Sequence, residues 1–82
     1  MTEKAVLKRV LSELKRGQGG RISRIRGEGS VHRRLLDMGM VAGSEIRVIR
    51  VAPFGDPVEI RVKGYNLTLR RAEADGIEVD VI

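Results

Sequence analysis

The chain has 82 residues, the size of one small domain over 1–82, and its 16 Lys and Arg against 11 Asp and Glu give a net charge of +5. It contains no cysteine, which excludes a disulfide framework, a thiolate metal site and a thiol nucleophile. No apolar run reaches membrane-spanning length, and the first twenty residues lack the apolar core of a secretory signal. We therefore expect a cytoplasmic protein without membrane insertion.

The N-terminal segment carries apolar residues at helical spacing, surrounded by Lys and Arg. The pattern predicts an N-terminal helix that ends at the glycines of 17–20. The next segment, 20–26, is expected as a strand, and the spacing of three between Ile22 and Ile25 indicates a bulge in it. The apolar residues that predict the helix are Val6, Leu7, Val10, Leu11 and Leu14.

The segment 30–43, SVHRRLLDMGMVAG, predicts a short capped helix. Ser30 can act as its N-cap. Gly39 stands where a left-handed residue would end the helix, and Met40 could close back on Leu35 in a Schellman-type contact. Because a helix of this length is unstable alone in water, it must cover another part of the molecule.

The remainder of the chain predicts short strands separated by turns. Apolar and polar residues alternate regularly in 58–63. In 45–51 this alternation changes phase midway, as expected of a strand that bends around a barrel. We expect strands at 45–51, 58–63, 67–69 and 77–81, a loop at 52–57, a hairpin connection at 64–66 and a helical turn at 72–76.

These elements predict a mostly β fold. It is a small SH3-like antiparallel β-barrel of about five strands, with an inserted short helix and an N-terminal helix. Aromatic residues are limited to Phe54 and Tyr65, so the core must be aliphatic. An open edge of such a barrel would allow strands of two copies to pair, which makes a homo-oligomer possible.

Catalytic and metal sites find little support in the residue pattern. His32 is the only histidine, and no spacing supports a catalytic triad around it. Asp37 lies five residues from His32 and Glu28 four residues before it, ahead of the cap, and neither pair matches a known ligand spacing. We expect no catalytic residue, no cofactor and no dedicated metal site; direct metal sensing is kept as a third hypothesis.

The positive charge is concentrated in residues 1–50, which carry twelve Lys and Arg against five Asp and Glu, whereas 51–82 carry four against six. A basic half indicates an acidic partner: nucleic acid, anionic lipid or an acidic protein face. Nucleic-acid-binding barrels of this size usually offer aromatic residues for base stacking, which are scarce here. A small basic nucleic-acid-binding barrel therefore stays the alternative function. The basic cluster comprises Arg21, Arg24, Arg26, Arg33 and Arg34.

The order of several short motifs resembles the FeoA family. The longest is R-R-L-x-D-M-G-M-x-x-G-S-x-I over 33–46, and the resemblance runs from about Leu11 to the C-terminus, leaving 1–10 as an unmatched extension. The other motifs are L-x-x-L-x-x-G over 11–17, G-R-I-x-x-I over 20–25, G-D-P-V-x-I-x-V-x-G over 55–64, L-x-L-R-x-x-E-A over 67–74 and I-x-V over 77–79.

The resemblance implies a non-enzymatic accessory protein of ferrous-iron uptake. Proteins of this family are thought to act on a large membrane ferrous-iron permease with a cytoplasmic GTP-binding domain. The family offers no universal ligand set, so the partner-binding surface is our own prediction. We expect the exposed side of the helix and two loops to form it, through Arg33, Arg34, Phe54, Asp56 and Tyr65.

Overall fold

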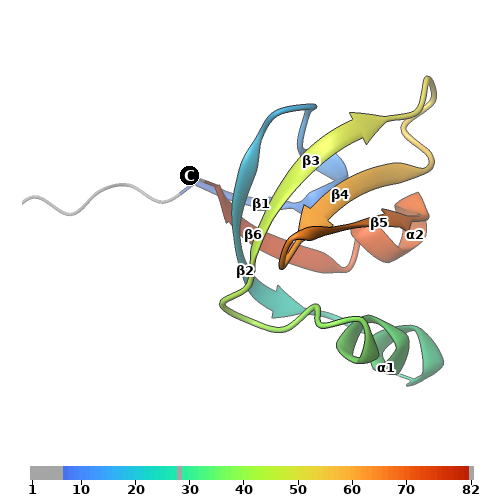
Figure 1. The fold of residues 1–82 in the computed structure, drawn as a ribbon. Helices are drawn as coiled ribbons and strands as arrows, with labels where there is room; N and C mark the ends of the chain where they lie inside the picture. Colours follow the sequence, from blue (N-terminus) through green and yellow to red (C-terminus); the bar gives the residue numbers. More distant parts are fainter. Residues whose placement is uncertain (1–6, 28, 82) are drawn as a thin grey trace, which may run out of the picture.

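The computed structural model describes residues 7–27 and 29–81, which form one antiparallel sheet with short helical segments (Figure 1). The strands follow the order β1-β6-β2-β3-β4-β5, so β1 and β5 are the two edges of the sheet. In chain order the elements are β1 (Leu7–Val10), the 3-10 turn η1 (Leu11–Glu13), β2 (Gly19–Ile25), α1 (Gly29–Asp37), β3 (Glu45–Val51), β4 (Val58–Val62), β5 (Tyr65–Leu69), α2 (Arg71–Ala74) and β6 (Ile77–Val81).

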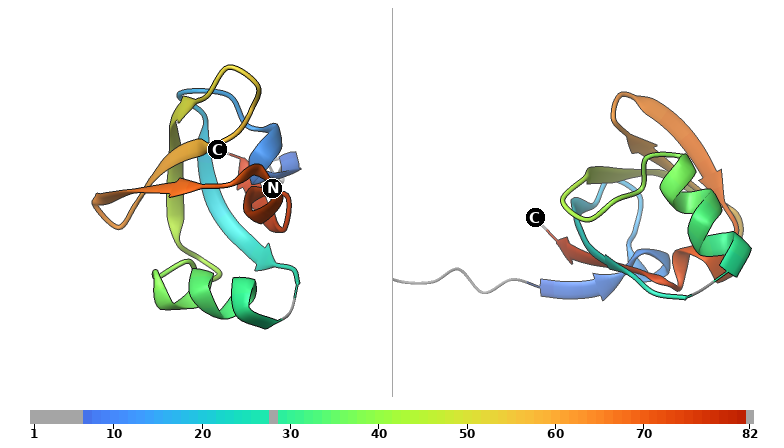
Figure 2. Two further views of the ribbon diagram at one scale, coloured as in Figure 1. Left: turned by 90° about the vertical axis from the view of Figure 1, so that its right-hand side faces the viewer. Right: turned by 90° about the horizontal axis from the view of Figure 1, so that it is seen from below.

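The sheet curls so that one of its faces encloses the core (Figure 2). Two register shifts bend it, one between Ile22 and Arg24 in β2 and one between Val48 and Arg50 in β3. Both were expected from the sequence, and both are confirmed. The aliphatic core is confirmed too, since its buried hydrophobic members are Leu11, Leu14, Ile22, Leu35, Met40, Ile46, Val48, Val58, Ile60, Val62, Leu69, Ala74, Ile77 and Val79.

The predicted N-terminal helix is wrong. Leu7–Val10 forms the edge strand β1, which pairs with β6, and only the three residues after it turn into a 3-10 helix; Val6 lies outside the described residues. The apolar spacing arises because Leu11, the first residue of that turn, and Leu14, just after it, are buried, while Leu7 remains half exposed. Pairing with β6 therefore overrides the local helical pattern.

The helix α1 ends as its sequence predicts. Gly39 has a φ of 85°, and its N–H donates to Leu36 O at 2.9 Å while Met40 N–H donates to Leu35 O at 3.0 Å, which is the Schellman pattern. Its start differs, because the helix begins at Gly29 and Ser30 lies inside the first turn instead of capping it. Leu35 and Met40 fix α1 across one end of the curled sheet, opposite the β3–β4 loop (Figures 1 and 2).

The hairpin between β4 and β5 is tighter than predicted. Lys63 and Gly64, with φ values of 51° and 83°, form a two-residue turn of the kind that matches strand twist. Tyr65 therefore belongs to β5 and faces Val62 in register, so its predicted place in a loop is wrong. This changes its role, because a strand residue has a fixed direction relative to the core.

Candidate functional site

The described residues contain no group of three or more His, Cys, Asp or Glu side chains close enough to hold a metal ion. His32 is partly buried on α1, and its Nδ1 atom is buried without a hydrogen-bond partner. Glu28, the other residue considered with it, lies outside the described residues. The features that stand out instead are on the surface: one protruding aromatic ring and several cationic side chains.

The two arginines predicted on the exposed side of α1 have different environments. Arg34 Nη1 lies 2.6 Å from Glu73 Oε2, and the Glu73 side chain is only 7% exposed. The second oxygen of Glu73 accepts a hydrogen bond from Arg70 N–H at 2.9 Å, so this carboxylate joins α1 to the start of α2. Arg34 thus has a structural role, whereas Arg33 is exposed and forms no ion pair with the described residues.

Tyr65 also serves to position α1. Its hydroxyl donates a hydrogen bond to the carbonyl oxygen of Met38, at the C-terminal end of the helix. The fit is close, because a Cβ atom added at Gly39 would lie 3.2 Å from the Tyr65 hydroxyl oxygen. Because Tyr65 is 41% exposed, only part of its side chain is accessible to a partner.

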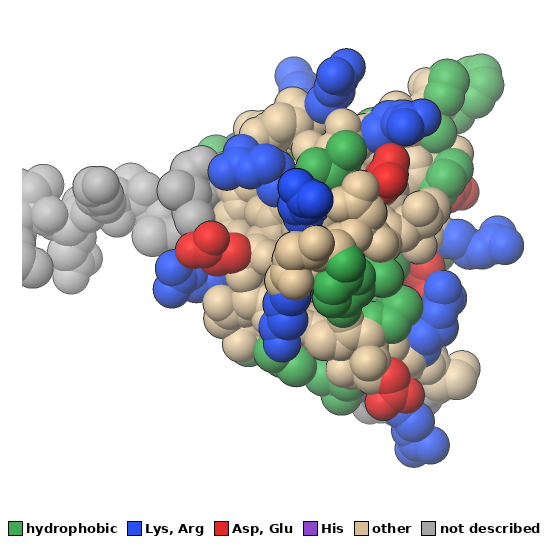
Figure 3. Space-filling view, in the orientation of Figure 1, with side chains coloured by type: hydrophobic (Ala, Val, Ile, Leu, Met, Phe, Trp, Pro, Cys, Tyr) green, Lys and Arg blue, Asp and Glu red, His purple; other side chains and the backbone are tan. Residues whose placement is uncertain are grey.

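The β3–β4 loop, residues 52–57, presents the most exposed large hydrophobic side chain among the described residues. Phe54 is 92% exposed. The base of the loop is ordered by hydrogen bonds from Ala52 N–H to Pro57 O at 3.0 Å and from Arg71 N–H to Asp56 Oδ1 at 3.1 Å. Figure 3 shows hydrophobic side chains protruding where this loop lies in Figure 1. An ordered loop with an exposed aromatic residue at its tip is suited to insertion into a partner's pocket.

Two of the predicted residues share a surface groove. Arg34 and Asp56 line a hollow of 420 Å³ between α1, the β3–β4 loop and the end of β5. Arg33, Phe54 and Tyr65 do not line it. The remaining lining residues are Pro57, Thr68, Arg70 and Glu73. Thr68 and Arg70 were missed by sequence reasoning, although the pair of arginines before a helical turn could have drawn attention to that end of β5.

A second basic surface was also missed. Arg47 on β3 and Arg61 on β4 are directly opposite in register, and together with Lys63 they line a hollow of 450 Å³. Like charges directly opposite on neighbouring strands are destabilising. The alternation of 58–63 placed Arg61 and Lys63 outward, but the neighbour across the strand could not be known from the sequence.

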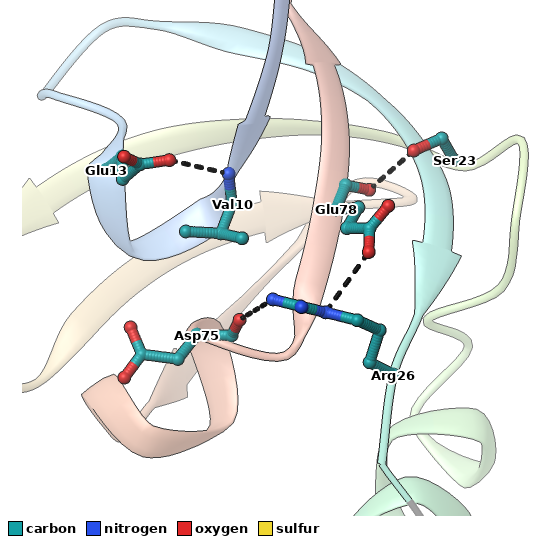
Figure 4. Close-up of polar contacts among 6 residues, drawn as sticks. All are labelled: Val10, Glu13, Ser23, Arg26, Asp75 and Glu78. Carbon is teal, nitrogen blue, oxygen red and sulfur yellow. Dashed lines mark hydrogen bonds and ion pairs between the residues drawn. The ribbon is translucent and has the colours of Figure 1, made fainter.

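The basic cluster of the N-terminal half is largely neutralised. Arg21 pairs with Glu45 at 3.0 Å, and Arg34 with Glu73. Figure 4 shows Arg26 between β2 and β6, with Nε 3.1 Å from Glu78 Oε2 and Nη2 donating to Asp75 O. Three of the five arginines are therefore in ion pairs, so this cluster itself offers no continuous run of free cations to a phosphate backbone.

The part of the chain that the structure describes has no helix both long and apolar enough to cross a membrane. Comparison with known proteins gives a curated relative in Porphyromonas gingivalis, the Fe(2+) transport protein A/Fe(2+) transporter FeoB fusion protein. It is 46% identical over 72 residues, which are 88% of this chain and 8% of the fusion protein. The chain thus spans a small part of that relative.

Two solved structures are similar over most of the chain. FeoA from Chlorobium tepidum has 44% identity and a TM-score of 0.83, covering 90% of this chain and 70% of that one. FeoA from Stenotrophomonas maltophilia, solved in complex with zinc and described as a prokaryotic SH3 domain protein, has 30% identity and a TM-score of 0.75, covering 85% and 87%. The predicted SH3-like fold is confirmed. The FeoA domain family matches residues 9–81, and the chain belongs to this family.

Proposed function

We propose that this chain is a non-enzymatic interaction module of ferrous-iron uptake that acts on a membrane ferrous-iron permease with a cytoplasmic GTP-binding domain. The observation that carries the proposal is the Porphyromonas gingivalis relative, in which a segment 46% identical to this chain is joined to a ferrous-iron transporter. Covalent joining holds two modules at high effective concentration, which is useful when the modules bind each other. A separate chain of the same family is expected to make the same contact.

The partner contact is proposed to centre on Phe54. A ring that is 92% exposed gains apolar burial only when a partner covers it, and its ordered loop has little conformational entropy left to lose on binding. Asp56 holds the base of the loop through Arg71 N–H. Arg33 supplies an exposed positive charge that would speed association with an acidic partner face.

Arg34 and Tyr65 belong to the same proposal as positioning residues. Their contacts with Glu73 and Met38 fix α1 to the rest of the fold, so that Arg33 is presented in one orientation. Substitution at either position is expected to affect partner binding through the placement of α1.

The test is a calorimetric titration of the full chain against the purified cytoplasmic domain of the cognate permease, in the nucleotide-free, GDP and GTP-analogue states. We expect stoichiometric binding in at least one state, weakened by Arg33→Glu. A parallel titration with a mixed-sequence oligonucleotide at two salt concentrations checks the alternative function, since phosphate binding must weaken steeply with salt. Absence of permease binding in every state, with salt-sensitive oligonucleotide binding, would contradict the proposal.

A further inference from the structure

The outer edge of β5 carries backbone groups without a protein partner. The tight turn at Lys63 and Gly64 makes Val62 and Tyr65 the first hydrogen-bonded pair between β4 and β5. Such pairs alternate along antiparallel strands, so the N–H and C=O groups of Asn66 and Thr68 point away from β4. Both residues are exposed, and their backbone groups form no hydrogen bond with other described elements.

The two edges of the sheet differ in how they are protected. Edge strands usually carry charged residues, Pro or bulges that prevent pairing with another chain. β1 follows this rule, because its sequence LKRV includes Lys8 and Arg9, and Lys8 pairs with Asp80 at 3.8 Å. β5, with the sequence YNLTL, contains no charge and no Pro, and its register with β4 is uninterrupted. β5 therefore lacks these barriers to the addition of a strand.

Cationic side chains surround this unprotected edge. Lys63 precedes β5, Arg70 follows it, and Arg61 is opposite Asn66 in register. None of these three cations forms an ion pair with the described residues.

The carboxylates near the edge are already engaged. Glu59, opposite Thr68, lies 3.6 Å from Arg50, and Glu73 lies 2.6 Å from Arg34. Asp56, which lines the groove at this edge, accepts a hydrogen bond from Arg71 N–H at 3.1 Å. The groove of 420 Å³ described above opens beside Thr68, at the end of the strand. The surroundings of β5 thus offer positive charge and space for an extended segment.

We propose that β5 accepts an extended, acidic segment of the partner protein as an additional antiparallel or parallel strand. Its backbone would pair with Asn66 and Thr68, and its carboxylates would face Arg61, Lys63 and Arg70. A second copy of this chain is a poorer occupant, since it would bring a second set of the same cations to the junction. The inference rests on the proposed function, because the acidic segment belongs to the permease's cytoplasmic domain.

Two variants at Thr68 distinguish the contribution of its backbone N–H to binding from that of its side chain. Thr68→Pro removes an outward N–H without removing a hydrogen bond to β4, and we expect it to weaken binding of the permease's cytoplasmic domain at least about tenfold. Thr68→Val keeps the N–H and the branched shape, so its affinity should stay within about twofold of the wild type. Equal loss in both variants, or no loss in Thr68→Pro, would contradict strand addition.

The charges are tested by Arg61→Glu combined with Lys63→Glu, against Arg9→Glu combined with Arg24→Glu as the control with the same change in net charge. Arg9 and Arg24 are exposed and form no ion pair with the described residues. The double reversal near β5 should weaken binding about tenfold or more and the control about twofold or less. Equal effects would show that overall charge, not the surroundings of β5, attracts the partner.

Amide hydrogen exchange measured by NMR on the wild-type chain makes the test independent of whether a variant folds. On binding the cytoplasmic domain, exchange at Asn66 and Thr68 should slow about tenfold or more, with Lys8 and Arg9 unchanged. Binding with unchanged exchange at Asn66 and Thr68 would overturn this inference and leave the proposed function intact. Absence of binding would overturn both, and slowed exchange that depends on the concentration of the free chain would indicate pairing between copies instead.

Discussion

The helix α1 and the tip of the β3–β4 loop lie far apart, and both elements were expected to contact a partner (Figure 1). The structure gives them different tasks. α1 is fixed by the buried Leu35, by Arg34 against Glu73 and by the Tyr65 hydroxyl on Met38 O. The loop is held by backbone hydrogen bonds from Ala52 N–H to Pro57 O and from Gly55 N–H to Ala52 O, and it leaves the Phe54 side chain exposed. Residues that the sequence alone predicts to be exposed can thus either stabilise the fold or remain free to bind a partner.

The comparison predicts that substitution of the residues that fix α1 changes stability, whereas substitution of Phe54 changes binding. Leu35→Ala should have the largest effect, a loss of about 2–5 kcal/mol in the free energy of unfolding, because the side chain is 1% exposed and its removal leaves a cavity. Urea unfolding followed by circular dichroism measures the change. A loss smaller than that of an exposed leucine, Leu36→Ala, would mean that α1 is not held by core packing.

Gly39→Val should cause the next largest loss in the free energy of unfolding, about 1–3 kcal/mol. A β-branched residue resists a positive φ, and its Cβ would approach the Tyr65 hydroxyl. Gly39→Asn is the matched control, since Asn tolerates the left-handed conformation and should lose less. Thermal unfolding of Gly39→Val and Gly39→Asn measures the difference in their melting temperatures. Equal melting temperatures of the wild type and Gly39→Val would contradict the cap.

Arg34→Glu should destabilise the fold by about 1–2 kcal/mol, since it places a carboxylate beside the buried Glu73, while the half-exposed position of Arg34 limits the effect. Arg33→Glu, one residue earlier and exposed, should change stability by less than about 0.5 kcal/mol. One denaturation experiment therefore distinguishes the contributions to stability of the two arginines that were expected to act together. Identical unfolding midpoints for both variants would show that the contact with Glu73 contributes nothing.

Much of the fold could be predicted because local patterns and tertiary contacts agree. The bounds of 45–51 and the cap at Gly39 depend on alternation and on glycine conformation, which are local properties. β1 could not be predicted, because its four residues pair with β6 at the far end of the chain and show no alternation of burial. Tyr65 was misplaced because the turn uses Lys63, a non-glycine residue with positive φ.

The candidate site was predictable only in part for the same reason. Phe54 stood out as an aromatic residue in a turn-forming loop, a signal contained in the sequence itself. The ion pair of Arg34 and Glu73 joins residues 39 positions apart, and the cross-strand pairing of Arg47 with Arg61 depends on strand register. The unprotected edge at β5 depends on sheet order, which no local pattern encodes.

The partner contact of the β3–β4 loop is tested most directly by comparing its exposed hydrophobic side chain with one on α1. Phe54→Ala and Leu36→Ala, which are 92% and 43% exposed in the wild type, are titrated against the cytoplasmic domain of the permease. Phe54→Ala should weaken binding about tenfold or more with an unchanged melting temperature, and Leu36→Ala should stay within about twofold. Unchanged affinity of Phe54→Ala, or a larger loss for Leu36→Ala, would contradict the assignment of the partner contact to the β3–β4 loop.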